Sequence, residues 1–179
     1  MKHTAHISVQ SCVLLLFVLC CAHGLTQEYT FTTLAGQPGV AGSNNGIGTD
    51  ATFYNPYGIA ADANGNLFVT DCKNHTIRTI TPEGVVTLFA GEAGLPGSVD
   101  GQRNSARFNL PWGIAIHSDG TIYVSEVGNH TIRKIATDGT VSLFAGLAGS
   151  SGTANGQGTD ARFFEPRGIA LDSSGNIYV

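Results

Sequence analysis

The sequence is poor in charged residues, and beyond its first 24 residues it is poor in cysteine. Only 12% of the 179 residues are charged and the net charge is −4, so the chain has no basic surface for nucleic acid or anionic lipid. After residue 24 the only cysteine is Cys72, which excludes a disulfide within that part of the chain. No later segment has the roughly 20 apolar residues that a membrane span needs. We therefore expect no nucleic-acid partner and no membrane insertion in this segment.

The first 24 residues have the features of a secretory signal peptide. Lys2 supplies a positive charge, and the almost continuously apolar run 11–22 follows it. That run is too short to span a bilayer and fits a signal-peptide core, although a buried core segment is the alternative. Ala22 and Gly24 place small residues at the −3 and −1 positions of a cleavage site after Gly24. This predicts a secreted, extracellular or cell-surface protein, or a periplasmic one if the source is bacterial.

The rest of the chain repeats itself every 55 residues. The five residues that start at Pro56 recur in similar form from Pro111 and from Pro166. Without a gap, 26 of the 55 positions are identical between residues 54–108 and 109–163. Such a period is the signature of a repeat architecture. It divides the chain into a signal peptide, an N-terminal strand with its loop, two complete repeats and one truncated repeat: 1–24, 25–53, 54–108, 109–163 and 164–179.

Each repeat predicts four short strands that are separated by turns. In the first repeat we expect them at 58–61, 66–70, 76–81 and 85–90. Four strands with short turns make an antiparallel meander, which has two open edges and one face that it cannot bury alone. Radial stacking of such sheets solves both problems. We therefore predict an all-β fold, a β-propeller of four-stranded antiparallel blades, with a linear β-solenoid as the alternative.

The chain holds about 2.8 repeats, fewer than the four blades that a closed ring needs. We therefore interpret it as an N-terminal part of a propeller that is cut within its third blade, with part of a larger assembly as the alternative. The segment from Tyr29 to Ala35 lies 55 residues before the fourth strand of the first repeat. We expect this segment to serve as the fourth strand of the last blade and so to close the ring.

The repeated residues resemble the NHL repeat, named for an Asn-His-Leu triplet that reads Asn-His-Thr here. The first copy supplies Phe53, Pro56, Gly58, Ile59, Ala60, Asp62, Gly65, Asn66, Asp71, Asn74, His75, Ile77 and Arg78. The second copy departs from this pattern at three positions, with His117 in place of Asp, Thr121 in place of Asn and Glu126 in place of Asp. The third copy matches the pattern as far as Val179. The resemblance implies a propeller, most often six-bladed. The family includes RNA-binding, protein-binding and receptor ectodomain members, and related six-bladed propellers include lactonases and a peptide-amidating lyase.

Positions that differ between repeats are free to serve function. The residue between the repeated Pro and Gly is Tyr57, Trp112 or Arg167, and these three residue types are frequent binding anchors. They are the candidate binding residues, at the mouth of the first strands. Ordinary packing between blades, or a solvated rim, is the alternative reading.

Other recurring polar residues have structural explanations. His75 and His130 fit a turn before the third strand better than a metal site. Asp71 with Arg78, and Glu126 with Arg133, suggest an ion pair between neighbouring strands of a blade. The segment 62–66 resembles a calcium loop but lacks its distal acidic ligand, so a hairpin turn explains it. Asn74 and Asn129 begin sequons, which makes them possible N-glycosylation sites.

We find no catalytic motif, metal ligand set or cofactor fingerprint in the sequence. Enzymatic activity therefore stays open, and the sequence favours a non-enzymatic binding module. The long loops 91–110 and 146–165 lie on one face of the ring, where we expect a protein or glycan ligand. The alternative is a metal-dependent hydrolase or lyase, gluconolactonase-like or peptide-amidating-lyase-like, with its ligands mostly in other blades. RNA binding is the third hypothesis, because the net negative charge and the export signal both oppose it.

Overall fold

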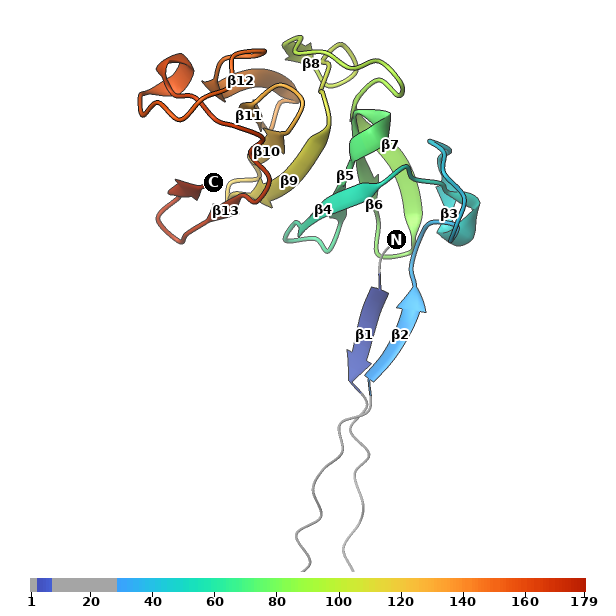
Figure 1. Cartoon of the computed structure of the whole chain (residues 1–179). Coiled ribbons are helices and arrows are strands. Elements are labelled where there is room, and N and C mark those ends of the chain that lie inside the picture. The colour runs from blue at the N-terminus through green and yellow to red at the C-terminus, as the bar shows by residue number, and fades with distance from the viewer. Residues whose placement is uncertain (1–2, 8–28) are drawn as a thin grey trace, which may run out of the picture.

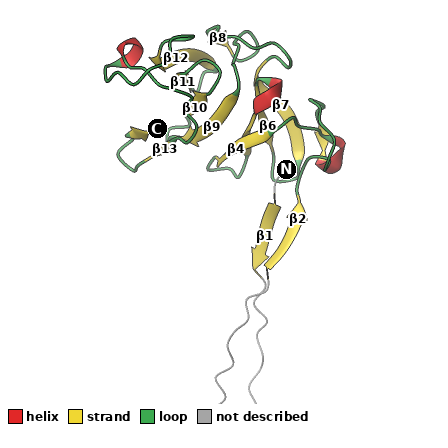
Figure 2. Cartoon of the chain, in the orientation of Figure 1, coloured by secondary structure: helices red, strands yellow, loops and turns green. Residues whose placement is uncertain are grey.

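The computed structural model describes residues 3–7 and 29–179, and their regular structure is almost entirely β-strand. The helical elements in these ranges are three single 3-10 turns, η1 (Gly48–Asp50), η2 (Cys72–Asn74) and η3 (Gly158–Asp160) (Figure 2). Among these elements no helix has the length and apolar character required to cross a membrane.

Two five-stranded antiparallel sheets form the body of the structure, and we call them blade 1 and blade 2 (Figure 1). The strands of blade 1 are β3 (Gly46–Ile47), β4 (Pro56–Ala61), β5 (Leu67–Asp71), β6 (Thr76–Ile80) and β7 (Val85–Gly91). Those of blade 2 are β8 (Gly101–Gln102), β9 (Pro111–Ile116), β10 (Ile122–Glu126), β11 (Thr131–Ile135) and β12 (Thr140–Gly146). In both blades the strand order is the same, β3-β7-β6-β5-β4 and β8-β12-β11-β10-β9. The predicted four-stranded meander is therefore confirmed in both complete repeats.

Each blade also has a short fifth strand that the sequence did not predict. It comes from the loop before the blade and pairs with the outermost strand, Ile47 with Val85 in blade 1 and Gly101 with Val141 in blade 2. A strand of two residues shows no alternating pattern, so periodicity does not reveal it. The segment before each blade therefore pairs with part of its outer edge, which would otherwise offer unpaired backbone groups.

The ends of the described chain form two smaller sheets. The truncated repeat contributes β13 (Ala170–Leu171) and β14 (Ile177–Tyr178), which are its first two strands. At the other end, β1 (His3–Ile7) pairs with β2 (Tyr29–Thr33) in a ribbon that projects from blade 1 (Figure 1). β2 is the strand that we expect to close the ring, and that expectation stays a prediction. Most of the predicted signal peptide and its cleavage site after Gly24 lie outside the described residues.

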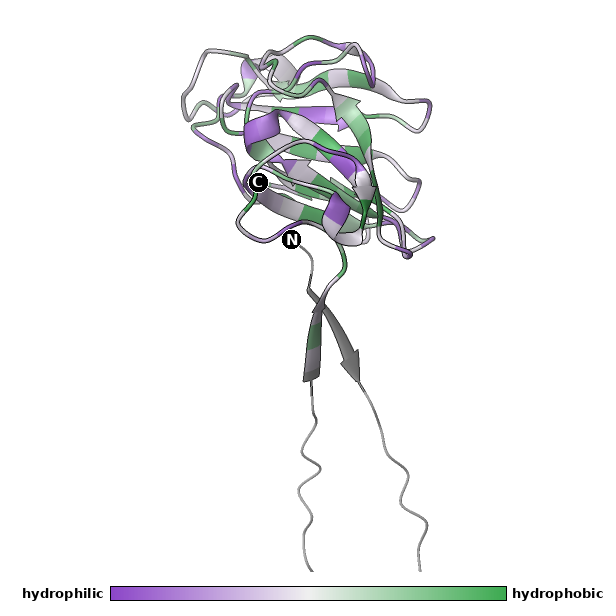
Figure 3. Ribbon diagram, turned by 90° about the vertical axis from the view of Figure 1, so that its right-hand side faces the viewer, coloured by the Kyte–Doolittle hydropathy of each residue, from purple (hydrophilic) through white to green (hydrophobic). Residues whose placement is uncertain are grey.

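The hydrophobic core lies between the blades as well as within them. Phe68, Ile77 and Ala90 of blade 1 share one buried cluster with Phe108 and Ile114 at the start of blade 2. A second cluster packs Leu67 and Ile80 of blade 1 against Ala35 and Phe53 from the segment before it. Figure 3 shows the apolar colour concentrated on the strands, with much of the polar colour on the loops. Because each blade buries its face against a neighbour, the arrangement is that of a propeller, as predicted.

Candidate functional site

The three candidate binding residues come together at the end of the blades that carries the long loops. Tyr57 and Trp112 lie one residue into β4 and β9, and Arg167 occupies the same position of the third repeat. The Tyr57 and Trp112 rings are stacked, with 3.6 Å between centroids and 14° between planes. The Arg167 guanidinium lies over the same Trp112 ring, 4.9 Å from its centroid. Equivalent side chains of three successive repeats thus form one ladder.

This ladder is partly packing and partly open surface. The contacts between its members are contacts between blades, as the alternative reading of the sequence expected. Tyr57 is nevertheless 48% exposed and the Arg167 side chain 56% exposed, while Trp112 is half-buried between them. Arg167 also pairs with Glu165 at 3.1 Å, which restricts its guanidinium. The ladder therefore presents aromatic and cationic surface whose side chains are already held in place.

Hydroxyl groups on the second strands fix the backbone under the ladder. Thr70 Oγ1 donates to the Trp112 carbonyl oxygen at 2.7 Å and accepts from the Gly58 N–H at 2.7 Å. Ser125 Oγ makes the same pair of contacts, donating to the Arg167 carbonyl at 2.7 Å and accepting from the Gly113 N–H at 2.9 Å. Our sequence reasoning missed these two residues. The available signal was a hydroxyl at the same position of both repeats.

The predicted ion pairs within the blades are confirmed. Arg78 lies 3.1 Å from Asp71, and Arg133 lies 3.5 Å from Glu126, with all four side chains buried. Burial raises the pKa of Asp71 and of Glu126, against the opposing pull of their hydrogen bonds and arginine partners. Asp71 Oδ1 also accepts from the Tyr54 N–H at 2.7 Å. These carboxylates therefore anchor the chain just before each first strand.

The histidines have the structural turn role that we expected. His75 and His130 both adopt the left-handed backbone conformation, with φ of 60°. The Nδ1 atom of His75 accepts from the Leu110 N–H at 3.1 Å, and that of His130 accepts from the Glu165 N–H at 3.1 Å. Each histidine thus ties its own repeat to the start of the next. In the described part of the chain no three His, Cys, Asp or Glu side chains are grouped to hold a metal ion.

The sequon asparagines are buried, and the side-chain nitrogen of each donates two hydrogen bonds. Asn74 Nδ2 donates to the Gly42 carbonyl and to Asp71 Oδ2, both at 2.7 Å. Asn129 Nδ2 likewise donates to the Gly97 carbonyl at 2.8 Å and to Glu126 Oε1 at 3.0 Å. A glycan on either nitrogen would replace a hydrogen that takes part in one of these bonds. The fold thus gives both side chains a structural role that glycosylation would disturb.

The segment 62–66 is a hairpin turn, as expected. Asp62 Oδ1 accepts from the Asn64 and Asn66 N–H groups at 2.9 and 2.8 Å. Asp62 Oδ2 accepts from the Asn66 side chain, and this bond is the main reason that the pKa of Asp62 is lowered. The truncated repeat builds the same turn with Asp172 and Asn176. Both carboxylates therefore stabilise backbone turns.

Comparison with known proteins agrees with the repeat structure. The family model for the NHL repeat matches residues 53–80 and 108–135. The Arabidopsis thaliana protein SUPPRESSOR OF QUENCHING 1, chloroplastic, is 35% identical over 52% of this chain and 9% of its own length. The Caenorhabditis elegans protein named as probable peptidyl-alpha-hydroxyglycine alpha-amidating lyase pgal-1 is 27% identical over 70% of this chain and 33% of its own.

A solved structure also resembles this chain. A structural genomics protein of unknown function from Bacteroides thetaiotaomicron superposes with a TM-score of 0.70 at 28% identity. The match covers 86% of this chain and 36% of that one. The described chain therefore corresponds to about a third of the solved relative and to a third or less of the two curated relatives.

Proposed function

Because this chain belongs to the NHL-repeat family of β-propellers, we propose that it is part of a secreted binding module whose long-loop face binds a protein or a glycan. The ladder of Tyr57, Trp112 and Arg167 is the observation that carries this proposal. Tyr, Trp and Arg dominate the energetics of binding surfaces. The ladder stacks them against one another, so little side-chain entropy is lost when a ligand binds.

The backbone under the ladder supports the same proposal. Thr70 and Ser125 hold the Trp112 and Arg167 carbonyls through buried hydroxyl groups, so the ladder stands on a rigid base. A rigid scaffold that presents exposed anchors beside long loops is the common arrangement of a binding surface. Export fits this role, because the predicted signal peptide would bring the face into contact with extracellular ligands.

The test uses the full chain in a glycan array and in a pull-down from extracellular material. We expect Trp112→Ala and Arg167→Ala to weaken the captured ligand at least 30-fold, the effect of losing about 2 kcal/mol at a central anchor. Phe144→Ala is the matched control, because Phe144 is a 42% exposed aromatic on the outer strand β12. Equal effects of all three substitutions, or no ligand above background, would contradict the proposal.

A second candidate is a metal-dependent lyase or hydrolase, which the match to the nematode lyase favours. The ladder itself does not fit a divalent cation, because it offers aromatic faces and a guanidinium in place of carboxylate or imidazole ligands. This candidate therefore requires ligands from residues beyond the ladder. Metal analysis of the purified full chain separates the two candidates. A stoichiometric, tightly held ion favours the enzyme. The absence of such an ion from protein that binds its ligand favours the binding module.

A further inference from the structure

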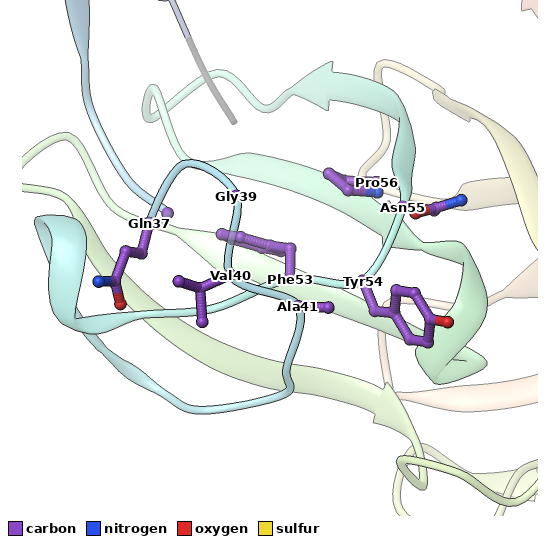
Figure 4. A pocket seen from close by; sticks show the side chains of 9 residues that line it. Gln37, Gly39, Val40, Ala41, Phe53, Tyr54, Asn55 and Pro56 are labelled. Atoms are coloured by element: carbon purple, nitrogen blue, oxygen red, sulfur yellow. The ribbon is translucent and has the colours of Figure 1, made fainter.

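A groove of about 530 Å³ lies between blade 1 and blade 2, lined by residues 79, 87–89, 102–104 and 138. We call it the inter-blade groove. Most of the side chains that line it are polar. Another groove, beside the start of blade 1, is lined mainly by apolar side chains such as Val40 and Phe53 (Figure 4). The inter-blade groove is therefore the one whose lining suits a polar ligand.

Arg103 distinguishes the inter-blade groove from the corresponding places in the other repeats. Its counterparts 55 positions away are Gly48 and Gly158. Both glycines have a left-handed backbone, with φ of 57° and 51°, a conformation that suits glycine. Gly139 leaves room for the arginine, because a Cβ there would lie 2.9 Å from Arg103 Nε. Of the three loops, only the one between blade 1 and blade 2 places a side chain at this point.

The Arg103 guanidinium is held in place without a polar partner. It lies over the Phe89 ring, 4.2 Å from the centroid, which is a cation–π contact. Its Nε atom is buried and has no hydrogen-bond partner in the described part of the chain.

The other arginines of the chain all have such a partner. Within residues 3–7 and 29–179, each of them pairs with a carboxylate or donates to a backbone carbonyl, and only Arg103 does neither. A partly buried cation without a hydrogen-bond partner gains from an acceptor that enters the groove.

The groove also holds a carboxylate, at Asp138 in the turn before β12. Its Oδ1 atom accepts from the Thr140 N–H at 2.8 Å, and this bond is the main reason that the pKa of Asp138 is lowered. Asp138 is therefore ionised at neutral pH. It is the one anionic residue in the lining and Arg103 is the one cationic residue, so the two charges balance.

Hydroxyl and amide groups complete the polar lining. The Thr79 and Thr87 hydroxyls lie 2.8 Å apart on neighbouring strands, and Gln102 and Asn104 supply side-chain amides. Leu88, which is 40% exposed, adds a small apolar surface. The groove thus offers donors, acceptors and groups that can serve as either.

This combination suits the hydroxyl groups of a sugar, because each of them can both donate and accept a hydrogen bond. The balanced charge disfavours a phosphate, sulfate or carboxylate, which would meet the Asp138 carboxylate together with the Arg103 guanidinium. The volume lies within the range of about 300–1,000 Å³ that is usual for small-molecule sites.

We propose that the inter-blade groove binds an uncharged saccharide, with the Arg103 guanidinium and the Asp138 carboxylate hydrogen-bonded to its hydroxyl groups. This site is separate from the ladder. The ladder begins on β4 and β9, at one edge of each sheet, whereas the groove involves β7 and β8 at the opposite edges. The two surfaces can therefore be tested independently.

The experiment applies the full chain to an array of short neutral saccharides and of matched saccharides that carry a carboxylate or a sulfate. Calorimetry then measures the affinity for the neutral saccharide that binds most strongly. We expect Arg103→Ala to weaken this binding at least about 10-fold, because a charge-assisted hydrogen bond is lost. Lys134→Ala is the matched control, since Lys134 is a cation on β11, the strand that corresponds to β6, and does not line the groove.

Asp138→Asn keeps an acceptor for the Thr140 N–H but removes the charge, so a site for a neutral sugar should weaken and a site for an anion should strengthen. Thermal unfolding checks that each variant is folded. NMR locates the bound sugar: amide shifts should change at Thr87 and Arg103 and stay constant at Tyr57. The proposal is overturned if no neutral saccharide binds, if Arg103→Ala and Lys134→Ala have equal effects, if Asp138→Asn strengthens binding of the acidic saccharides, or if the shifts change only at the ladder.

Discussion

The hydroxyl of Thr70 in blade 1 donates a hydrogen bond to the carbonyl oxygen of Trp112 in blade 2, at 2.7 Å. The same hydroxyl accepts from the Gly58 N–H, so one buried side chain joins the first strands of two blades.

Thr70→Val keeps the shape of the side chain but removes both hydrogen bonds and leaves buried groups unpaired. We expect the free energy of unfolding to fall by about 1–3 kcal/mol, measured by urea denaturation. Thr70→Ser should restore most of the stability, because Ser125 makes the same contacts in blade 2. If the serine and valine variants were equally unstable, the hydroxyl would not be the cause.

Gly58 allows the close approach of the two first strands. A Cβ added there would overlap the Trp112 carbonyl oxygen, whereas a Cβ at the equivalent Gly168 of the third repeat would meet nothing within 4 Å. We therefore expect Gly58→Ala to destabilise the 179-residue chain by about 1–3 kcal/mol and Gly168→Ala to have little effect. Thermal unfolding of both variants provides the measurement. A Gly168→Ala variant as unstable as Gly58→Ala would show that the blade spacing is not the cause.

The buried ion pair of Asp71 and Arg78 should matter far more than an exposed one. Asp71→Ala leaves the Arg78 guanidinium buried without its carboxylate and removes acceptors from Tyr54 and Asn74. We expect a loss of about 3–5 kcal/mol in urea denaturation. Glu92→Ala is the control, because Glu92 pairs with Arg107 through a half-exposed carboxylate, for which the loss should be below about 1 kcal/mol. Similar losses in the two variants would refute the argument from burial.

Cys72 should be chemically inert in the folded protein. It is 2% exposed, and burial raises the pKa of its thiol to about 11. At pH 8 only about one molecule in a thousand then carries the reactive thiolate. In a chain that starts at residue 25, we expect a thiol reagent to label Cys72 fully in denaturant and hardly at all in native buffer. Native labelling should rise with pH towards 11. Rapid stoichiometric labelling of the folded chain at pH 8 would contradict the burial.

Asn74 and Asn129 should lack glycans in protein secreted by eukaryotic cells. Both amide nitrogens donate two hydrogen bonds, one of them buried, so a glycan would break one of the two and expose the turn before the third strand. Intact mass before and after glycosidase treatment gives the answer. A new sequon at an exposed loop, made by Gln157→Thr so that the exposed Asn155 begins it, serves as the control that the cells glycosylate this chain. A glycan on Asn74 in soluble, folded protein would show that the turn tolerates the change.

The sequence by itself determined the repeat, the four main strands of each blade and the ion pairs within a blade. These features depend on residues that are close in the chain: Asp71 meets Arg78 because the two lie on neighbouring strands of one hairpin. The turn role of His75 and the hairpin at Asp62 follow from local backbone geometry in the same way. The 55-residue period then carried each conclusion from one repeat to the next.

Only the tertiary structure decided which residues of one repeat contact residues of the next. The stacking of Tyr57 on Trp112, the bond from Thr70 to the Trp112 carbonyl and the bond from the Leu110 N–H to His75 all join residues 35 to 55 positions apart. Whether such residues touch depends on the distance and angle between packed blades, which are set by buried side chains such as Phe108 and by the space that Gly58 leaves open. A repeat period specifies which positions are equivalent, and the packing of one blade on the next specifies which of them meet.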